Sequence, residues 1–413
     1  MSIDSAPDVL PSPAEGRWPG LATPPHSPAR ALAARMLFAA VVRSLPIKVM
    51  LPNGGRMGAG GPNAPALWLL RPADFFHRLG VDGTIGLGEA YMVGDWTTDA
   101  LVEVLTPFAE RIADLVPRPL RTLRGLAGHR KPTREHNTIA GAKDNIHRHY
   151  DLSNDLFTKF LDDTMTYSCA WFAPGTDDLT AAQERKVDAI LDYAGVRAGS
   201  RVLEIGSGWG TLAIRAALRG ADITSLTISG EQKTLADQRI EAAGVADRAR
   251  VVLRDYREET GRYDAVVSVE MIEAVGHQYW PAYFGAVDRM LVPGGRFALQ
   301  AITMPHAQLL ATRQSQGWPH KYIFPGGELL STTEIDRQVA RTGMRITERQ
   351  SLGAHYARTL RQWRERFLHR WPDITALGFD DTFRRMWEFY LAYFESGFRA
   401  EYLDVWQLRM DKD

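Results

Sequence analysis

One short run constrains the fold more than any other feature: EIGSGWG at residues 204–210, in which glycines alternate with larger residues. It follows a predicted strand, 201–205, and precedes a predicted helix, 211–219. An earlier helix is expected to begin at a capping box formed by Thr180 and Gln183. Further strands are predicted at 223–228, 250–253, 265–269 and 297–302, with a helix over 231–243. This alternation predicts an α/β fold, a doubly wound parallel sheet of the Rossmann-like kind.

The spacing of the glycines distinguishes two classes of ligand. A dinucleotide loop needs Gly-x-Gly-x-x-Gly and an acidic residue about 20 residues later for the ribose. Here Gly210 comes one position early, and residues 226–228 are Leu-Thr-Ile. S-adenosylmethionine has no pyrophosphate, and the carboxylate of Glu204 suits its cationic methionine end. The run therefore favours S-adenosylmethionine over a dinucleotide, and a purely structural glycine turn is the remaining alternative.

Further cofactor contacts are expected where ligands of such sheets bind, at the carboxyl ends of the strands. The second strand ends at Thr227 and Ile228, near the expected ribose. The third is followed by Asp255, Tyr256 and Arg257. There the carboxylate is placed to accept from the adenine amine and the tyrosine ring to stack on the base. A rim aromatic without ligand contact is the alternative for the tyrosine.

The rest of the chain predicts further parts. Residues 1–30 contain seven prolines and predict a disordered tail. A small α+β domain is expected over 31–115, with a helix at 31–45, a hairpin around 52–56 and a strand at 66–70. A basic connector, 116–150, leads to the larger domain, 151–413. Nine Lys or Arg against three acidic residues over 111–150 fit either a solvated connector or a patch for anionic lipid headgroups.

Composition narrows the class of protein. The 49 basic and 49 acidic side chains balance, so nothing attracts the whole molecule to nucleic acid. The single cysteine, Cys169, excludes an internal disulfide framework and a multi-cysteine metal site. The longest apolar window, 31–51, is interrupted by Arg35, Pro46 and other polar residues, and no secretion signal precedes it. We therefore expect a cytoplasmic protein, peripheral to the inner face of the cell membrane, with no metal.

Four further runs are not general features of such a sheet. They are HYDLSNDLF at 149–157, TMTYSCAWF at 164–172, VEMIEAVG at 269–276 and GAHYARTL at 353–360. Together with EIGSGWG they resemble the cyclopropane-fatty-acyl-phospholipid synthase family over about residues 139–408, and GEAYM at 88–92 extends the resemblance towards the N-terminus. The resemblance implies a class I methyltransferase that transfers a methyl group from S-adenosylmethionine to the cis double bond of an acyl chain.

The resemblance also implies roles for individual residues. The cofactor would be held by Tyr167, Ser168, Gly206, Gly208, Thr227, Ile228, Gln232 and Tyr256, and the loop adds Glu204 and Gly210. In the bacterial cyclopropane synthases a bicarbonate ion acts as general base. The positions that hold it correspond here to Cys169, Glu273, Gln300, Ile302 and Tyr356. The alternatives are a small buried hydrophobe for Cys169, a helix-start carboxylate for Glu273 and a core hydrogen-bonding residue for Gln300.

Two positions that are usually histidine in the family differ here, Ala274 and Gln300. Glutamine can orient an anion but cannot titrate near neutral pH. The base is then either bicarbonate held differently or Glu273 itself. This combination resembles an actinobacterial branch that methylates oleoyl chains of phospholipids at carbon 10. The product there is a 10-methylene chain, which a separate reductase converts to 10-methylstearic (tuberculostearic) acid.

Several alternatives remain open on the sequence. Cyclopropane is the alternative product, because one carbocation leads to either. A methyltransferase for a small soluble acceptor is a second reading. A non-catalytic lipid-binding protein is a third, and the intact Glu204, Gly206, Gly208 and Glu273 argue against it. The sequence does not fix the oligomeric state, and a homodimer is one state we consider.

Overall fold

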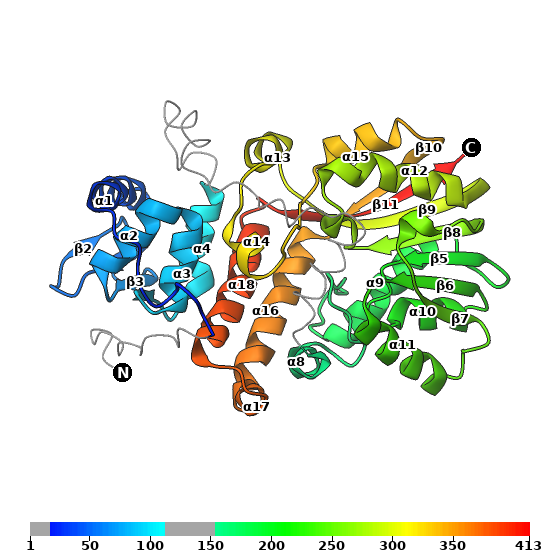
Figure 1. Cartoon of the computed structure of the whole chain (residues 1–413), viewed down its shortest axis with the longest axis horizontal. Coiled ribbons are helices and arrows are strands. Elements are labelled where there is room, and N and C mark those ends of the chain that lie inside the picture. The colour runs from blue at the N-terminus through cyan, green and yellow to red at the C-terminus, as the bar shows by residue number, and fades with distance from the viewer. Residues whose placement is uncertain (1–16, 112–152) are drawn as a thin grey trace. The chain divides into compact units, whose positions relative to one another are not determined.

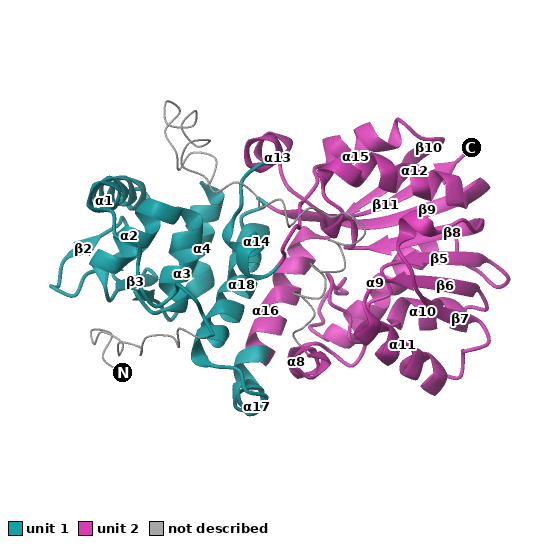
Figure 2. Cartoon of the chain, viewed as in Figure 1, with its two compact units in different colours: residues 1–131, 314–323, 367–402 teal, residues 132–313, 324–366, 403–413 magenta. Residues whose placement is uncertain are grey.

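The computed structural model describes residues 17–111 and 153–413, which fall into two compact units coloured separately in Figure 2. Unit 1 comprises residues 1–131, 314–323 and 367–402, and unit 2 comprises 132–313, 324–366 and 403–413. The sequence-based boundaries placed 314–323 and 367–402 in the larger domain, so the division differs there. The whole of the predicted basic connector, 116–150, lies outside the described residues, as does the first half of the predicted tail.

Unit 1 is the small α+β part expected near the N-terminus. Its sheet has the order β2-β1-β3-β4. Its elements are α1 (Pro28–Val42), β1 (Lys48–Met50), β2 (Arg56–Met57), β3 (Ala66–Leu69), α2 (Pro72–Asp82), α3 (Thr84–Met92), β4 (Trp96–Thr97), α4 (Leu101–Glu110), α14 (Trp318–Tyr322), α17 (Trp371–Ala376) and α18 (Asp381–Arg399). Part of the predicted tail is ordered here, because α1 already begins at Pro28 and the indole of Trp18 donates to Asp380.

Unit 2 contains a seven-stranded sheet of order β10-β11-β9-β8-β5-β6-β7 (Figure 1). Its strands are β5 (Arg201–Ile205), β6 (Asp222–Thr227), β7 (Ala249–Leu253), β8 (Tyr263–Val269), β9 (Leu291–Thr303), β10 (Met344–Ser351) and β11 (Asp404–Lys412). Strands β5 to β9 run parallel, whereas β11 is antiparallel to both β9 and β10. The predicted doubly wound sheet is confirmed, and strands β10 and β11, which extend it beyond β9, were not predicted.

Helices cover both faces of this sheet (Figure 1). They are α8 (Asn154–Phe160), α9 (Leu179–Tyr193), α10 (Thr211–Leu218), α11 (Gly230–Ala242), α12 (Trp280–Met290), α13 (His306–Thr312) and α15 (Thr332–Val339), with 3₁₀ turns η2 (Tyr256–Glu258), η3 (Ile272–Ala274) and η4 (His277–Tyr279). Helix α16 (Gly353–His369) has residues in both units.

Successive residues of each central strand enter different cores, as the two-residue period of a strand requires. Val202 of β5 packs with residues of α9, α10 and α11, whereas Leu203 packs with residues of α12 and α15. In β8, Val267 packs in the same core as Val202, and Val266 packs in the same core as Leu203. Burial on both faces explains why consecutive residues of these strands, such as Val202 and Leu203, are both apolar.

One local prediction, the cap of a helix, is wrong. Helix α9 is capped by Asp178, whose carboxylate accepts from the Ala181 backbone N–H at 3.1 Å, and not by the Thr180 capping box. Aspartate is as good an N-cap as threonine, and the chain places it one residue before the first turn. The described helices include none that is both long and apolar enough to cross a membrane.

Candidate active site

The predicted site lies at the carboxyl ends of β5 and β8, which are neighbours in the sheet. From β5 the chain continues to β6 on one side, and from β8 it continues to β9 on the other. This is the topological switch point, where sheets of this kind bind ligands. The glycine run follows β5, and the VEMIEAVG run begins as β8 ends. The fold thus brings together two motifs that are about 60 residues apart in the sequence.

The glycine loop has the geometry of a ligand cradle. The backbone N–H groups of Gly206 and Ser207 both donate to Leu226 O, at 2.9 and 3.0 Å, so the loop bends over the end of β6. Gly206 has a φ of +96°, and a Cβ added there would lie 3.0 Å from Met271 Cγ. The buried Ser207 hydroxyl has no hydrogen-bond partner among the described residues. A close-fitting loop with an unsatisfied polar atom suits the polar end of S-adenosylmethionine.

Glu204 supplies a buried acid beneath this loop. Its Oε2 accepts from the Ser225 hydroxyl at 2.5 Å, and the side chain is 4% exposed. Burial raises the pKa of Glu204 to about 8, while the hydrogen bond from Ser225 and the charge of Lys186 act in the opposite direction. A cationic ligand group nearby would favour the ionised carboxylate. The position therefore fits the charge of a bound methionine end, although its role stays a prediction.

The predicted ribose and adenine residues follow β6 and β7. The Thr227 hydroxyl donates to Gln232 Oε1 at 3.1 Å, and Ile228 is partly exposed beside them. The carboxylate of Asp255 is held by Arg257 through contacts of 2.8 and 2.6 Å. The carboxylate that was predicted to accept from the adenine amine therefore already accepts from Arg257.

Arg257 also lies over the Tyr256 ring, 5.6 Å from its centroid. The Tyr256 side chain is 8% exposed. The structure leaves the cofactor contacts of Asp255, Tyr256 and Arg257 as predictions.

An aromatic cluster lies beside the glycine loop. The Tyr167 ring packs against Phe157 at 5.1 Å and against Trp363 at 5.2 Å. Phe157 also contacts Trp209 of the loop, and Trp363 contacts Tyr356 of α16. The cluster therefore links the predicted cofactor residues to the predicted base site with side chains that exclude water.

Three of the predicted base-site residues converge on a carboxylate that the sequence reasoning missed, Glu270. Its Oε1 accepts from the Cys169 backbone N–H at 2.9 Å and from Gln300 Nε2 at 2.7 Å. Its Oε2 accepts from the Tyr356 hydroxyl at 2.6 Å. The side chain is partly buried, and Lys186 is its nearby cation.

Glu273, the residue predicted to act in this site, is placed differently. Its Oε1 accepts from the Ile302 backbone N–H at 2.6 Å, and its Oε2 has no partner among the described residues. Burial raises the pKa of Glu273 to about 8, and the charge of Glu270 acts in the same direction. Glu273 is therefore mainly protonated at neutral pH.

Hydrogen bonds fix Gln300 from both ends of its amide. Its Oε1 accepts from Gln407 Nε2 of β11 at 3.0 Å, which leaves Nε2 to donate to Glu270. Gln300 is fully buried, whereas Ala274 is exposed on η3. The two departures from the family pattern are therefore not equivalent, and only Gln300 contacts the carboxylate.

Cys169 contributes its backbone to the site and not its sulfur. The Sγ lies 3.2 Å from Ala170 O and 3.6 Å from Leu352 O, and the side chain is fully buried. Burial raises the pKa of the Cys169 thiol well above its usual range. The thiol is therefore neutral, and only the N–H points to Glu270.

Lys186 is a second residue that the sequence reasoning missed. This lysine of α9 is 1% exposed, and its ammonium group donates to the Ser168 hydroxyl at 2.6 Å. Burial lowers the pKa of Lys186 to about 8, while Glu270 is the strongest influence that raises it again. The amphipathic pattern of α9 placed Lys186 on the same face as Val187 and Ile190, and a lysine on a buried face was the available signal.

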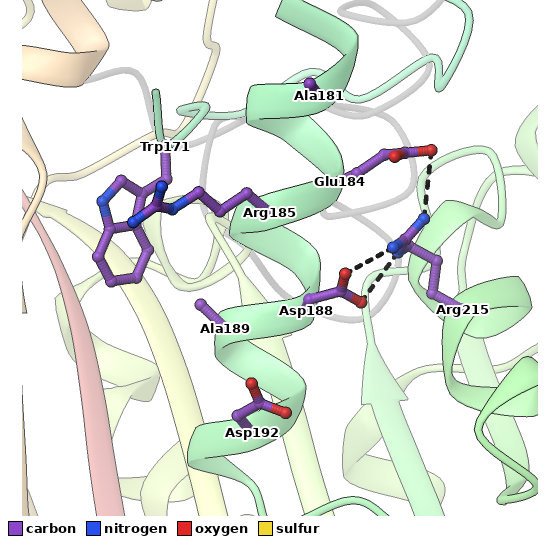
Figure 3. A pocket seen from close by; sticks show the side chains of 8 residues that line it. All are labelled: Trp171, Ala181, Glu184, Arg185, Asp188, Ala189, Asp192 and Arg215. Atoms are coloured by element: carbon purple, nitrogen blue, oxygen red, sulfur yellow. Dashed lines mark hydrogen bonds and ion pairs between the residues drawn. The ribbon is translucent and has the colours of Figure 1, made fainter. Parts of the chain in front are cut away.

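A surface pocket of about 470 Å³ lies along α9, and Trp171 of the TMTYSCAWF run is among its lining residues. Figure 3 shows Arg215 paired with Glu184 and Asp188, and the Arg185 guanidinium near the Trp171 ring. It contains none of the predicted site residues. Among the described residues there is also no group of three or more His, Cys, Asp or Glu suited to a metal ion.

Comparison with known proteins gives consistent matches. The profile of a family described as mycolic acid cyclopropane synthetase matches residues 138–408. The chain is 51% identical to the tuberculostearic acid methyltransferase UfaA1 of Mycobacterium tuberculosis, over 95% of this chain and 94% of that protein. It is 36% identical to the cyclopropane-fatty-acyl-phospholipid synthase of Escherichia coli K12, over 84% and 88%. The solved structure of mycolic acid cyclopropane synthase CmaA1 complexed with SAH and CTAB matches with a TM-score of 0.60 and 30% identity, over 68% of this chain and 99% of that one.

Proposed function

The chain belongs to the mycolic acid cyclopropane synthetase family, and from this membership we propose that it methylates oleoyl chains of membrane phospholipids to 10-methylene chains. The family expected from the sequence motifs is confirmed, and S-adenosylmethionine is the methyl donor. The observation that carries the proposed product is the 51% identity to a tuberculostearic acid methyltransferase over nearly the whole chain.

The residues of the site suit the demands of this reaction. S-adenosylmethionine supplies an electrophilic methyl group, and an alkene is a poor nucleophile that must be held close and in line with it. The π pair forms the new carbon–carbon bond as the methyl–sulfur bond breaks, which leaves a positive charge on the neighbouring alkene carbon. Water at that carbon would give an alcohol, so the aromatic cluster of Phe157, Tyr167, Trp209 and Trp363 protects the cation.

The fate of the cation determines the product. Proton loss from the new methyl group with ring closure gives a cyclopropane. A hydride shift from the methylated carbon moves the charge to that carbon, and proton loss from the methyl group then gives the exomethylene. Either route needs one base, held at a fixed place beside the chain.

A direct assay tests this function. With methyl-labelled S-adenosylmethionine and dioleoyl phospholipid vesicles, the protein is expected to give labelled lipid whose proton NMR spectrum shows exomethylene protons. The two products have equal mass, so the spectrum and not the mass identifies them. Cyclopropane signals alone would establish the alternative product. Label found only in a small soluble acceptor would show that the substrate class is wrong.

We also propose that α1 of unit 1 brings the protein to an anionic bilayer surface. Leu32 and Met36, four residues apart on this helix, are 60% and 62% exposed. Arg35 and Arg43 are exposed on or just after the same helix. Apolar side chains flanked by arginines match an interfacial helix, in which the apolar groups insert and the cations meet lipid headgroups.

Substitution of both apolar residues tests this contact. A Leu32→Ser/Met36→Ser variant is expected to bind vesicles containing phosphatidylglycerol about tenfold more weakly in co-sedimentation, because two partly inserted side chains no longer leave water. Leu218→Ser is the matched control, since Leu218 of α10 is equally exposed at 66% but lies in unit 2. Equal losses in both variants would exclude a specific role of α1.

One partner follows from the proposed product. A methylene group must gain two hydrogens to become a methyl branch, so we propose a separate reductase as the next enzyme. The homodimer considered from the sequence stays a prediction. Bicarbonate is the base expected from the family resemblance, and the contacts of Glu270 bear on it directly.

A further inference from the structure

We propose that Glu270 is the catalytic base of this chain, occupying with its own carboxylate the place expected for a bicarbonate ion. The inference rests on the methyl transfer proposed above and deepens it. It assigns the proton-accepting atom to a residue that the sequence motifs did not single out.

The hydrogen-bond donors of the site carry the argument. Five positions were expected to hold bicarbonate, and three of them donate to Glu270: the Cys169 N–H, the Gln300 amide and the Tyr356 hydroxyl. A fourth, the Ile302 N–H, donates to Glu273. The predicted anion contacts are thus already made to carboxylates of the chain itself. A carboxylate has the planar shape and the single negative charge of bicarbonate, so it satisfies the same donors.

The backbone at Glu270 shows that the placement is imposed by the site. Its φ is +48°, in the left-handed region that few residues other than glycine adopt. Strained backbone of this kind persists where the surroundings over-determine it, often at functional sites. Here three donated hydrogen bonds hold the side chain, and the Glu270 N–H donates to Gln300 O at 2.8 Å.

The carboxylate also lies at the correct end of the fold. Glu270 directly follows β8, and the next residue, Met271, packs against the glycine loop so closely that a Cβ on Gly206 would be 3.0 Å from its Cγ. The neighbour of the proposed base in the sequence therefore contacts the loop that fits the methyl donor.

The donors and the cation around Glu270 stabilise its ionised form and oppose the effect of burial. Burial raises the pKa of Glu270, but the donors Tyr356, Cys169 and Gln300 and the Lys186 ammonium all act to lower it. The other acidic group beside it, Glu273, has a pKa of about 8 and adds little negative charge at neutral pH.

The proposed step balances without a further reactant. The methyl C–H bond of the cation breaks, its electron pair becomes the second bond of the exomethylene, and the proton goes to a carboxylate oxygen of Glu270. The carboxylic acid then returns this proton to solvent. Nothing is oxidised or reduced.

Omission of carbonate gives the first test. In buffer freed of carbon dioxide, the unmodified protein is expected to keep its full rate of methyl transfer, and added bicarbonate is expected to change that rate less than twofold. A rate that falls in this buffer and returns with bicarbonate would overturn the inference while leaving the methyl transfer intact. A protein that labels no lipid under either condition would instead contradict the proposed function.

A Glu270→Gly variant gives the second test, because it removes the carboxylate and relieves the left-handed backbone. Its rate in carbonate-free buffer is expected to fall about 100-fold, within the range that general bases contribute. Added formate or bicarbonate is expected to raise the rate of this variant about tenfold, because the anion can enter the space that the side chain leaves. Glu334→Gln, which removes a buried carboxylate of α15 outside the site, is the matched control. Its rate in carbonate-free buffer is expected to stay the same with or without an added anion. Full activity of Glu270→Gly without any anion would refute the role of Glu270.

Discussion

A Gly206→Val variant is expected to lose about 1,000-fold in kcat/KM for S-adenosylmethionine while the sheet remains folded. Gly206 has a φ of +96°, which is strongly unfavourable for a β-branched residue. The added Cβ would also lie 3.0 Å from Met271 Cγ and 3.2 Å from Met271 Cβ. The loop must therefore move, and a backbone shift of about 1 Å at a site of this kind costs about 100-fold or more. Backbone strain of about 1–3 kcal/mol adds to that loss.

A second glycine, near the other end of β5, separates the local strain from the effect on the ligand. Gly199 lies before the opposite end of the strand, has a φ of +80° and has no atom within 4 Å of an added Cβ. Gly199→Val should thus lower the melting temperature while keeping the affinity for S-adenosylmethionine within about twofold. Isothermal titration and circular dichroism measure both. Equal affinity losses in the two variants would mean that the loop at Gly206 does not hold the cofactor.

The central fold was predictable because local pattern and tertiary structure agree there. Strands buried on both faces contain consecutive apolar residues, as in β5, and the glycine run marks the turn after that strand. The edge strand β10 was missed for the opposite reason. β10 is mostly exposed and polar, and such a strand carries almost no hydrophobic period.

The division into units was not predictable from periodicity for a related reason. Segments 314–323 and 367–402 join unit 1 through packing that no local pattern records. An example is the buried Arg385 of α18, whose guanidinium lies 3.9 Å from the centroid of the Tyr91 ring. Contacts between residues about 300 positions apart need the folded chain.

The site shows the same limit at the level of one residue. The motif VEMIEAVG contains two glutamates, and the resemblance selected Glu273. Glu270 accepts three hydrogen bonds because its backbone is left-handed and because three donor groups from distant segments point to its carboxylate. Residue types at the site were therefore predictable, whereas the residue at its centre was not.

A Glu270→Gln variant is expected to lower kcat about 1,000-fold with the affinity for S-adenosylmethionine unchanged within about twofold. The amide has the size of the carboxylate, so the site keeps its shape and no anion can enter, but an amide cannot accept the proton. The loss lies within the 10²–10⁴-fold range of general base catalysis. Unlike Glu270→Gly, this variant should gain nothing from formate.

The pH dependence gives an independent check on the same residue. The base must be ionised, so kcat should rise with pH as Glu270 loses its proton. Because burial raises the pKa of Glu270, this rise should lie above the ordinary range of a glutamate. Tyr356→Phe removes a donor to the charged form, so the rise should move to higher pH. Tyr193→Phe, on the distant end of α9, is the control and should leave the profile in place.

A substitution of the neighbouring Glu273 distinguishes which of the two glutamates is the base. Glu273 has a pKa of about 8 and is mainly neutral at pH 7, so glutamine resembles its working form. Glu273→Gln should therefore cost no more than about tenfold in kcat, since a neutral hydrogen-bonded group contributes about 1 kcal/mol. The ratio of the two losses at pH 7 assigns the base. If Glu273→Gln is the more damaging of the pair, the proton goes to Glu273, and Glu270 serves only to position it.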